Sequence, residues 1–312
     1  MTLVRVALVS AREALALDED MPPLIDALTA RGALVETPYW DDAAIDWGRF
    51  DVAVLRSTWD YVERVEEFLQ WADRCRRVTR LLNPPEIVRW NTDKHYLAAL
   101  AAAGVPVVPT RFVEPGSDAD AEFECFLAGA AGSVSVGAVT EFAGFVVKPS
   151  IGAGSRDAAR YRRSDAREAG AHLRRLVVAE RRSAMLQPYL DRVDDYGETA
   201  VIYLGGRYSH AIRKGPLLRV GDGLVAGLFA PEQISVREPD AAELRVAAAA
   251  FAVVPGEPAL YARIDLIRDD HGGPVVLELE LTEPSLFLLY GTGAGAALSQ
   301  AILDRAGPSP AR

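Results

Sequence analysis

Cysteine and histidine are both scarce in this sequence, and the few that occur are scattered. The 312 residues include two cysteines, Cys75 and Cys125, and four histidines. A disulfide framework needs a larger set of cysteines, and a zinc site needs clustered cysteine or histidine ligands. The sequence therefore argues against a disulfide-stabilised protein and against a zinc centre.

Long hydrophobic runs are also absent. No stretch approaches the roughly 18 to 20 apolar residues that cross a membrane as a helix. The opening "MTLVRVALVSAREALALDED" turns acidic after a short apolar run and has no small-residue cleavage site. It therefore predicts a first strand and not a secretory signal. We expect a cytoplasmic protein that does not associate with membranes.

Positive charge is in deficit, with 34 lysines and arginines against 44 acidic residues and a net charge of -10. This balance argues against a nucleic-acid partner, whose phosphates require a basic face. Short basic runs near 160–163 and 180–182 are typical of solvated helix faces. The length and the 50% of hydrophobic residues fit a globular enzyme of two or three structural units.

Strands and helices alternate in the first part of the chain. Residues 3–10 and 33–37 and the segment "FDVAVL" are short and apolar, which predicts buried strands. Residues 21–31 predict a helix, and apolar side chains from Tyr61 to Cys75 recur at helical spacing. The alternation predicts a parallel α/β unit that ends near "NPPE".

Two hairpins stand out in the rest of the chain. "TAVIYLGGRYSHAIRK" turns at Gly205–Gly206, and "RDDHGG" joins "YARIDLI" to "PVVLELEL". Glycine and proline between 215 and 233 predict a mobile loop. The other expected elements are helices near 92–103 and 285–305, an extended segment at 104–113 and a strand within 183–190.

The second hairpin carries alternating charged residues. Because every second residue of a strand faces the same side, Arg263 and Asp265 share one face, as do Glu278 and Glu280. The short connection brings Asp265 beside the two glutamates. Oxygen ligands of this kind suit Mg²⁺ or Mn²⁺ and not zinc. The alternative is an exposed strand face whose acids meet only solvent.

A lysine and a glycine loop follow one another in "FVVKPSIGAGSRD". Lys148 stands at a strand end, where ligands gather in α/β proteins, and the loop amides after it can wrap phosphate oxygens. The dinucleotide fingerprint needs a third glycine and a place after the first strand. The pattern therefore predicts a phosphate site and argues against hydride transfer with a nicotinamide cofactor.

A second lysine supports an anion site. Asn91 or Thr92 can cap the helix expected near 92–103, which places Lys94 in its first turn. The helix dipole disfavours a cation there and favours a bound anion. Lys94 is therefore either a solvated side chain or a partner of the same anion.

The order of these motifs resembles the ATP-grasp superfamily. Lys94, "GVPVVPT", "VVKPSIGAGSRD", "MLQPYL", "GETAVIYLGG", "ARIDL" and "LELELTEPS" occur in that order, and the resemblance covers about residues 1 to 305. It implies an α/β and α+β architecture: an ATP-grasp fold after a Rossmann-like pre-ATP-grasp domain. We expect that domain at 1–88, a small lobe with the glycine loop at 89–185, and a lobe with the metal-binding hairpin at 186–312.

The resemblance also assigns roles to individual residues. The Mg²⁺ ligands would be Asp265, Glu278 and Glu280, although the family commonly has asparagine in place of Glu280. Arg263 and Lys214 would act on the transferring phosphoryl group. The ATP-binding residues would be Lys94, Lys148, Ser150, Gly152, Gly154, Ser155, Gln187, Tyr189, Leu190, Glu198 and Arg213.

The substrate is expected where "LRSTWDY" leaves a strand, because ligands bind at the carboxyl ends of parallel strands. A small amino-acid-like molecule would suit the cation, hydroxyls, acid and aromatics there. Alternatively, the hydroxyl and acidic residues cap the next helix and the tryptophan belongs to the core. Ser285 either caps the last helix or binds a substrate carboxylate. The candidate substrate residues are Ser10, Arg56, Ser57, Thr58, Trp59, Asp60 and Ser285.

The implied activity is that of an ATP- and Mg²⁺-dependent ligase. Such an enzyme activates a carboxylate as an acyl phosphate, which an amine-type nucleophile then attacks. "LRSTWDY" and "VVKPSIGAGSRDAARY" are similar to a bacterial subgroup that includes a D-cycloserine-forming ligase, which implies ring closure of O-ureido-D-serine. A small-molecule kinase and a non-catalytic nucleotide-binding module are the alternatives. The resemblance is also compatible with a homodimer.

Overall fold

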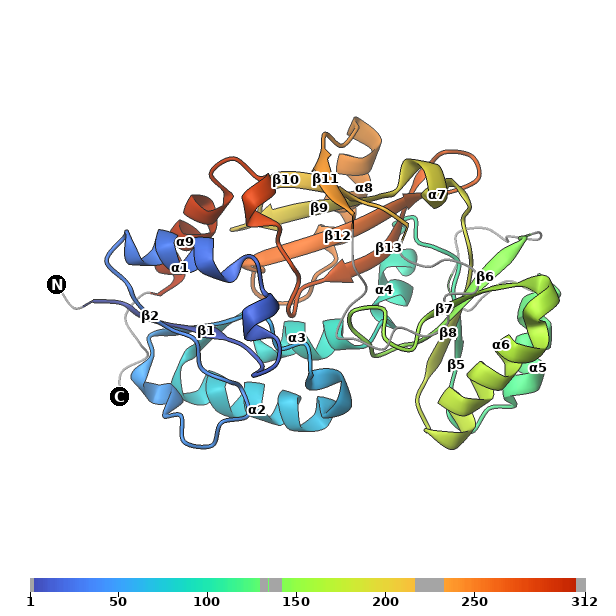
Figure 1. Cartoon of the computed structure of the whole chain (residues 1–312), viewed down its shortest axis with the longest axis horizontal. Helices are drawn as coiled ribbons and strands as arrows, with labels where there is room; N and C mark the ends of the chain where they lie inside the picture. The colour runs from blue at the N-terminus through green and yellow to red at the C-terminus, as the bar shows by residue number, and fades with distance from the viewer. Residues whose placement is uncertain (1–2, 130–133, 135–141, 217–232, 307–312) are drawn as a thin grey trace.

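Three sheets form the framework of the protein (Figure 1). The computed structural model describes residues 3–129, 134, 142–216 and 233–306. In strand order the sheets are β2-β1-β3-β4, β5-β8-β6-β7 and β11-β10-β9-β12-β13. Within these described ranges, no helix is long and apolar enough to cross a membrane.

The N-terminal sheet is parallel, as the alternating pattern predicts. Side chains of β1 alternate between its two faces: Val6 and Leu8 pack with α1, whereas Ala7 and Val9 pack with α2. The short fourth strand was not predicted. The elements are β1 Arg5–Val9, α1 Met21–Thr29, β2 Leu34–Glu36, β3 Val52–Leu55, α2 Val65–Val78, β4 Arg80–Leu82 and α3 Pro85–Thr92.

The second sheet is antiparallel and belongs to the small lobe, with α5 and α6 packed against it (Figure 1). Phe145 and Val147 of its central strand share a core with Phe123 and Leu173 of these two helices. The elements are α4 Tyr96–Ala102, β5 Arg111–Val113, α5 Ala119–Leu127, β6 Gly144–Pro149, β7 Ala159–Arg162, α6 Ala166–Arg174, the π-helical turn Arg175–Ala179 and β8 Ala184–Pro188.

The third sheet is antiparallel and contains both predicted hairpins. It shares a core with the N-terminal sheet, because Ile202 and Tyr261 pack with Leu24 of α1 and Leu298 of α9. The elements are α7 Arg192–Tyr196, β9 Glu198–Leu204, β10 Arg207–Lys214, β11 Ile234–Arg237, α8 Ala241–Ala252, β12 Tyr261–Arg268, β13 Pro274–Glu280 and α9 Ala294–Arg305.

The domain limits at 88 and 185 remain our proposal, with one adjustment. β8 runs from Ala184 to Pro188 and pairs with β5 and β6 of the small lobe. A boundary at 185 would cut this strand, so we propose that the small lobe extends to Pro188.

Two expected helices differ from those observed. The helix expected near 92–103 is split: α3 ends at Thr92 and α4 begins at Tyr96, which leaves Lys94 in the connection. Asn91 does not cap a helix, because its amide bonds Leu279 and Leu281 backbone groups at 2.7 Å each. These strong bonds to the third sheet outweigh continuation of a single helix.

The last helix also starts later than expected. α9 begins at Ala294 after Gly293, so Ser285 lies well before it and cannot cap it. The caps expected after β3 are also missing, since Asp60 makes no capping hydrogen bond and binds Trp40 and Arg64 instead. The loop expected at 215–233 falls mostly on 217–232, outside the described residues.

A buried ion pair joins the N-terminal unit to the segment after β13. The Arg56 side chain is fully buried and lies 3.2 Å from the Asp20 carboxylate and 3.4 Å from that of Asp18. Asp20 also accepts three backbone N–H bonds, from Leu286, Phe287 and Leu288, at 2.6 to 3.1 Å. One carboxylate therefore fixes the path of a whole turn of chain.

Replacing Arg56 with methionine should destabilise the protein strongly. Loss of one partner from a buried ion pair leaves an uncompensated charge, which typically lowers the free energy of unfolding by about 3–5 kcal/mol. Arg76→Met is a matched control, because Arg76 and its partner Glu257 are exposed, and it should change stability by less than about 1 kcal/mol. Urea unfolding followed by circular dichroism measures both; equal losses would contradict this account.

Candidate active site

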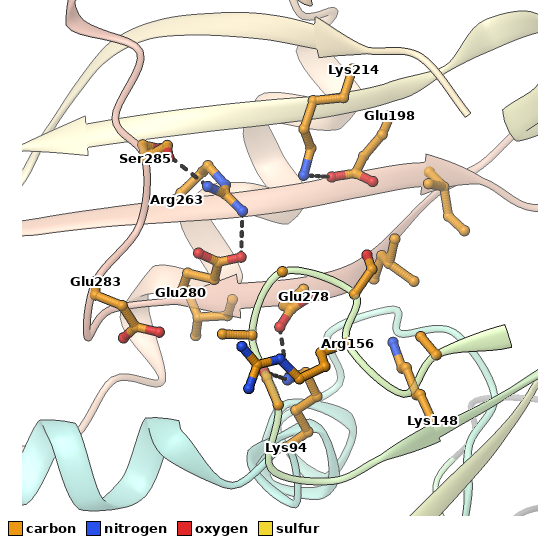
Figure 2. Close-up of a pocket in the computed structure, with 18 of the residues that line it drawn as sticks. Lys94, Lys148, Arg156, Glu198, Lys214, Arg263, Glu278, Glu280, Glu283 and Ser285 are labelled. Carbon is orange, nitrogen blue, oxygen red and sulfur yellow. Dashed lines mark hydrogen bonds and ion pairs between the residues drawn. The ribbon is translucent and has the colours of Figure 1, made fainter. Parts of the chain in front are cut away.

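A cavity of about 580 Å³ lies where the three sheets meet. Side chains from β6, β8, β12 and β13 line it, together with the glycine loop and the segments after β3 and β13. Figure 2 shows its charged groups converging from these separate elements. The predicted residues on its wall are Trp59, Lys94, Lys148, Gly152, Gly154, Ser155, Gln187, Tyr189, Leu190, Glu198, Lys214, Arg263, Glu278, Glu280 and Ser285.

One part of the cavity wall is apolar. Its aliphatic side chains come from β6, from the connection after β8, from α7 and from the β12–β13 hairpin. Gln187, at the end of β8, is held by a 2.8 Å bond from its amide nitrogen to the Thr110 hydroxyl. A flat heterocycle would fit between such surfaces. The aliphatic residues of this part are Val146, Leu190, Val193, Ile267 and Leu277.

Lys94 links the two sides of the cavity. Its ammonium lies 3.0 Å from the Glu278 carboxylate and donates to the Gly152 carbonyl at 2.7 Å. Its backbone N–H donates to the carbonyl of Ser150 at 3.0 Å. Burial acts to lower the pKa of Lys94, but Glu278 and its acidic neighbours leave this pKa above its usual value. Lys94 therefore stays charged beside the glycine loop.

Lys148 points into the cavity from the end of β6 (Figure 2). Within the described residues it forms no ion pair with a carboxylate. Burial, with the nearby charges of Lys94 and Lys214, lowers the pKa of Lys148 to about 8 although Glu278 acts to raise it. A partly buried ammonium without a close counter-ion favours binding of an anion such as phosphate.

The carboxylate hairpin places Asp265 beside the glutamates, as expected, with a register shift between Asp265 and Leu266 that was not predicted. Arg263 stands opposite Glu280, and Asp265 stands opposite Glu278. Arg263 donates to both oxygens of Asp265, at 2.9 and 3.1 Å from Nε, and it also pairs with Glu280. Lys214 donates to Asp265 at 2.8 Å. Burial opposes ionisation of Asp265, but these two cations hold its pKa well below the usual range.

Glu198 begins β9 and forms an ion pair with Lys214. Burial raises the pKa of Glu198 although the Lys214 ammonium acts to lower it. Gly197 comes just before, with a φ of 77°, and a Cβ there would lie 2.7 Å from the Lys214 carbonyl oxygen. Glycine is therefore needed at 197 for β9 and β10 to bring Glu198 and Lys214 together.

Carboxylate oxygens on the cavity wall are of the kind that a hard divalent cation such as Mg²⁺ prefers, but they are too few to hold the ion without other ligands. Glu278 and Glu280 line the cavity, and burial together with neighbouring Glu278 and Asp265 raises the pKa of Glu280 to about 7 although Arg263 lowers it. In the described part of the chain, no three acidic, histidine or cysteine side chains are grouped to hold a metal by themselves. Mg²⁺ is commonly bound by one or two carboxylates plus phosphates and water, and Glu278 and Glu280 are two carboxylates on the wall of one cavity.

Eight predicted site residues do not lie on the cavity wall, and several of them make other contacts. The Ser10 and Ser57 hydroxyls bond each other at 2.8 Å, and Arg213 donates from Nε to the Tyr196 carbonyl at 2.8 Å. Arg56 holds the segment after β13, as described above. The eight are Ser10, Arg56, Ser57, Thr58, Asp60, Ser150, Arg213 and Asp265.

Several charged or polar wall residues were not predicted as site residues, among them Asp20, Tyr61, Arg156 and Glu283. Tyr61 and Arg156 lie within or beside motifs quoted above, "LRSTWDY" and "GAGSRD". Glu283 belongs to "LELELTEPS", but it follows the end of β13, where strand alternation no longer indicates a direction. Asp20 shows no sequence signal that would distinguish it from a surface acid.

Comparisons with known proteins identify the family. Residues 6–83 match the model for the N-terminal domain of D-cycloserine synthetase DcsG. The chain is 42% identical over 308 residues to the cycloserine biosynthesis protein DcsG of Streptomyces lavendulae, covering 97% of this chain and 99% of that protein. The crystal structure of D-cycloserine synthetase DcsG superposes with a TM-score of 0.88 at 42% identity, over 97% of this chain and 99% of that one.

A more distant structure shares the fold. The ATP-grasp ligase PsnB, solved with a minimal precursor, Mg and ADP, matches with a TM-score of 0.61 at 17% identity, over 97% of this chain and 98% of that one. The fold and these similarities define the class: the chain belongs to the ATP-grasp ligase family. Within that family it is a homologue of D-cycloserine synthetase. The family and fold predicted from the motifs are confirmed.

Magnesium affinity should depend on pH through Glu280. A carboxyl group with a pKa of about 7 is largely protonated at pH 6 and largely ionised at pH 8. Protons compete with the metal below the pKa, so Mg²⁺ affinity should rise roughly 10-fold from pH 6 to pH 8. Calorimetric titration of Mg²⁺ with a non-hydrolysable ATP analogue measures this.

Glu280→Asn is the matched control, because it keeps an oxygen ligand that does not titrate. In that variant the pH dependence should shrink to the part that comes from the nucleotide phosphates. If wild type and variant show the same pH profile, Glu280 does not contribute to the metal site.

Proposed function

We propose that this ligase closes the D-cycloserine ring from O-ureido-D-serine, using ATP and Mg²⁺ to activate the substrate carboxylate as an acyl phosphate. One observation carries the proposal: Lys94 and Lys148 face Glu278 and Glu280 in a single cavity (Figure 2). The 42% identity to DcsG over nearly the full chain supports the choice of product.

The nucleotide would bind with its adenine in the apolar part of the cavity. Val146 and Ile267 belong to opposite lobes there, and Glu198 would accept hydrogen bonds from the ribose. Lys148, next to this part, would pair with the phosphates. The loop Gly152–Ser155 would cover them with its backbone amides. Binding phosphate beside Lys148 would supply the counter-ion that this partly buried ammonium lacks.

The phosphoryl-transfer centre would lie at the end of the β12–β13 hairpin away from its turn, where Arg263, Glu278 and Glu280 stand. Glu278 and Glu280 would hold Mg²⁺, which neutralises charge on the phosphates when it is bound. Asp265 would act indirectly, because Arg263 and Lys214 occupy its oxygens. Its role is to keep these two cations aligned. Arg263 would then steady the transferring phosphoryl group.

The chemistry follows from the weak electrophilicity of a carboxylate. A substrate carboxylate oxygen attacks the terminal phosphorus of ATP, ADP leaves, and an acyl phosphate forms. The nitrogen bonded to the side-chain oxygen then attacks the acyl carbon, so that a C–N bond forms while the bond to phosphate breaks. D-Cycloserine lacks the carbamoyl group of O-ureido-D-serine, so hydrolytic loss of this group must accompany ring closure.

A coupled assay tests the proposal. ADP and phosphate should appear when O-ureido-D-serine is supplied and not with ATP alone. Added hydroxylamine should trap the acyl phosphate as a hydroxamate. A stable phosphorylated product would identify a kinase instead, and tight binding of Mg·ATP without ADP release for any acid would indicate a non-catalytic nucleotide-binding module.

Glu278→Gln should reduce kcat by roughly 100-fold or more, because it removes a charged ligand that acts on the developing transition-state charge. It also weakens the hold on Lys94, which pairs with this carboxylate. Glu257→Gln is a matched control, since Glu257 is exposed and lies outside the cavity. Steady-state ADP release measures both; near-normal turnover in Glu278→Gln would contradict the assigned role.

A further inference from the structure

Glu283 is a buried carboxylate on the cavity wall that the scheme above leaves without a role. It lies three residues beyond β13, and only 9% of its surface is exposed. Figure 2 shows it at the same end of the cavity as Ser285, Arg263 and Glu280, on the side away from Lys148. It therefore lies where the substrate carboxylate would meet the phosphoryl-transfer centre.

Glu283 differs from the neighbouring carboxylates in having no cationic partner. Glu278 pairs with Lys94, Glu280 with Arg263, and Glu198 with Lys214. Within the described residues, no lysine, arginine or histidine forms an ion pair with Glu283, and its side chain bonds only the Tyr61 hydroxyl. A carboxylate has room for about four hydrogen bonds. Most of its accepting capacity is therefore open to the cavity.

Burial makes an unpaired carboxylate unfavourable. Burial and the repulsion of Glu280 raise the pKa of Glu283 to about 8, although Tyr61 and Lys94 act to lower it. A positively charged group of a ligand would supply the missing counter-ion and restore the ionised form. Such a perturbed group in a cavity is a typical feature of a binding site.

The backbone around Glu283 is held rigidly. Four successive carbonyls each accept a hydrogen bond from a different side chain, at 2.9 to 3.2 Å. A binding group that must recognise one position of a small molecule needs such support. The bonds run from Tyr261 to Thr282, from Trp59 to Glu283, from Arg56 to Pro284 and from Arg263 to Ser285.

We propose that Glu283, aligned by Tyr61, binds the α-ammonium group of the amino-acid substrate and so selects α-amino acids over other carboxylic acids. The inference rests on the proposed function, because it places the reacting carboxylate near Arg263. In an α-amino acid the ammonium group is two bonds from the carboxyl carbon. A carboxylate beside the phosphoryl-transfer centre is placed to reach that group.

The first test compares two substrates in two proteins. The wild type should use O-ureido-D-serine with a kcat/KM roughly 10- to 100-fold above that for the same acid without its amino group, as expected for loss of a charge-assisted hydrogen bond. In Glu283→Gln this preference should fall to within about 3-fold. The amide keeps the size of the side chain and its bond to Tyr61 but loses the charge.

Controls separate recognition of the ammonium group from loss of structure. The KM for ATP should change little in Glu283→Gln, and Tyr61→Phe should give an intermediate preference, because the carboxylate remains but is less well aligned. Glu257→Gln should leave the preference unchanged. If Glu283→Gln favours the amino acid as strongly as the wild type does, or if the wild type shows no preference, the inference is wrong.

A binding measurement keeps this inference distinct from the proposed function. D-Serine and 3-hydroxypropanoate are titrated calorimetrically into protein saturated with Mg²⁺ and a non-hydrolysable ATP analogue. If no acid supports ADP release, the proposed function fails. Tighter binding of D-serine by the wild type, lost in Glu283→Gln, would still support the ammonium site. Equal binding of both acids by the wild type would overturn it.

Discussion

The carboxylate of Asp20 organises the segment after β13, which forms one end of the cavity wall. It accepts three consecutive backbone N–H groups from the segment after β13 and faces the buried guanidinium of Arg56. Phe287, one of these donors, has a left-handed backbone with φ of 51°, which is unfavourable for a bulky side chain. Asp20 therefore stabilises a turn that would not form alone, and it does so from a different structural unit.

This constraint explains why the N-terminal unit is needed for a site that lies mainly on the other two sheets. Arg56 and Trp59 bind the carbonyls of Pro284 and Glu283, while Asp20 binds the amides that follow. The segment carrying Glu283 and Ser285 is thus fixed through both its carbonyl and its amide groups. Tyr61, from the same N-terminal loop, adds its hydroxyl to the Glu283 carboxylate. The loop contributes mainly by positioning the wall.

The sequence predicted the hairpin site well because strand alternation and a short connection determine which residues stand opposite each other. The exact pairs Arg263–Glu280 and Asp265–Glu278 also depend on a one-residue register shift between Asp265 and Leu266, which strand alternation alone does not indicate. The order of motifs also sufficed to predict the family. By contrast, the position of Lys94 was predicted incorrectly, because Asn91 bonds to β13 and its neighbours break into two helices. Such long-range bonds leave no periodic signal.

The same end of the cavity shows a second limit of sequence patterns. The rule that ligands gather at strand ends directed attention to "LRSTWDY", part of which lines the cavity, but it could not say which of its side chains turn toward the cavity. Trp59 and Tyr61 do so, whereas Arg56 and Ser57 turn back into buried contacts. That choice depends on partners more than 30 residues away, such as Asp20 and Pro284.

Lys148 and Glu283, at opposite ends of the cavity, make its two ends electrostatically different. Lys148 at one end is partly buried and Glu283 at the other is buried, and neither forms an ion pair among the described residues. Desolvation moves the pKa of each to about 8, toward the neutral form. A ligand pair with phosphates at one end and an ammonium group at the other would satisfy both. ATP and an α-amino acid have this polarity. The same charges disfavour the reverse arrangement, so they would favour one orientation of ATP and an amino-acid substrate.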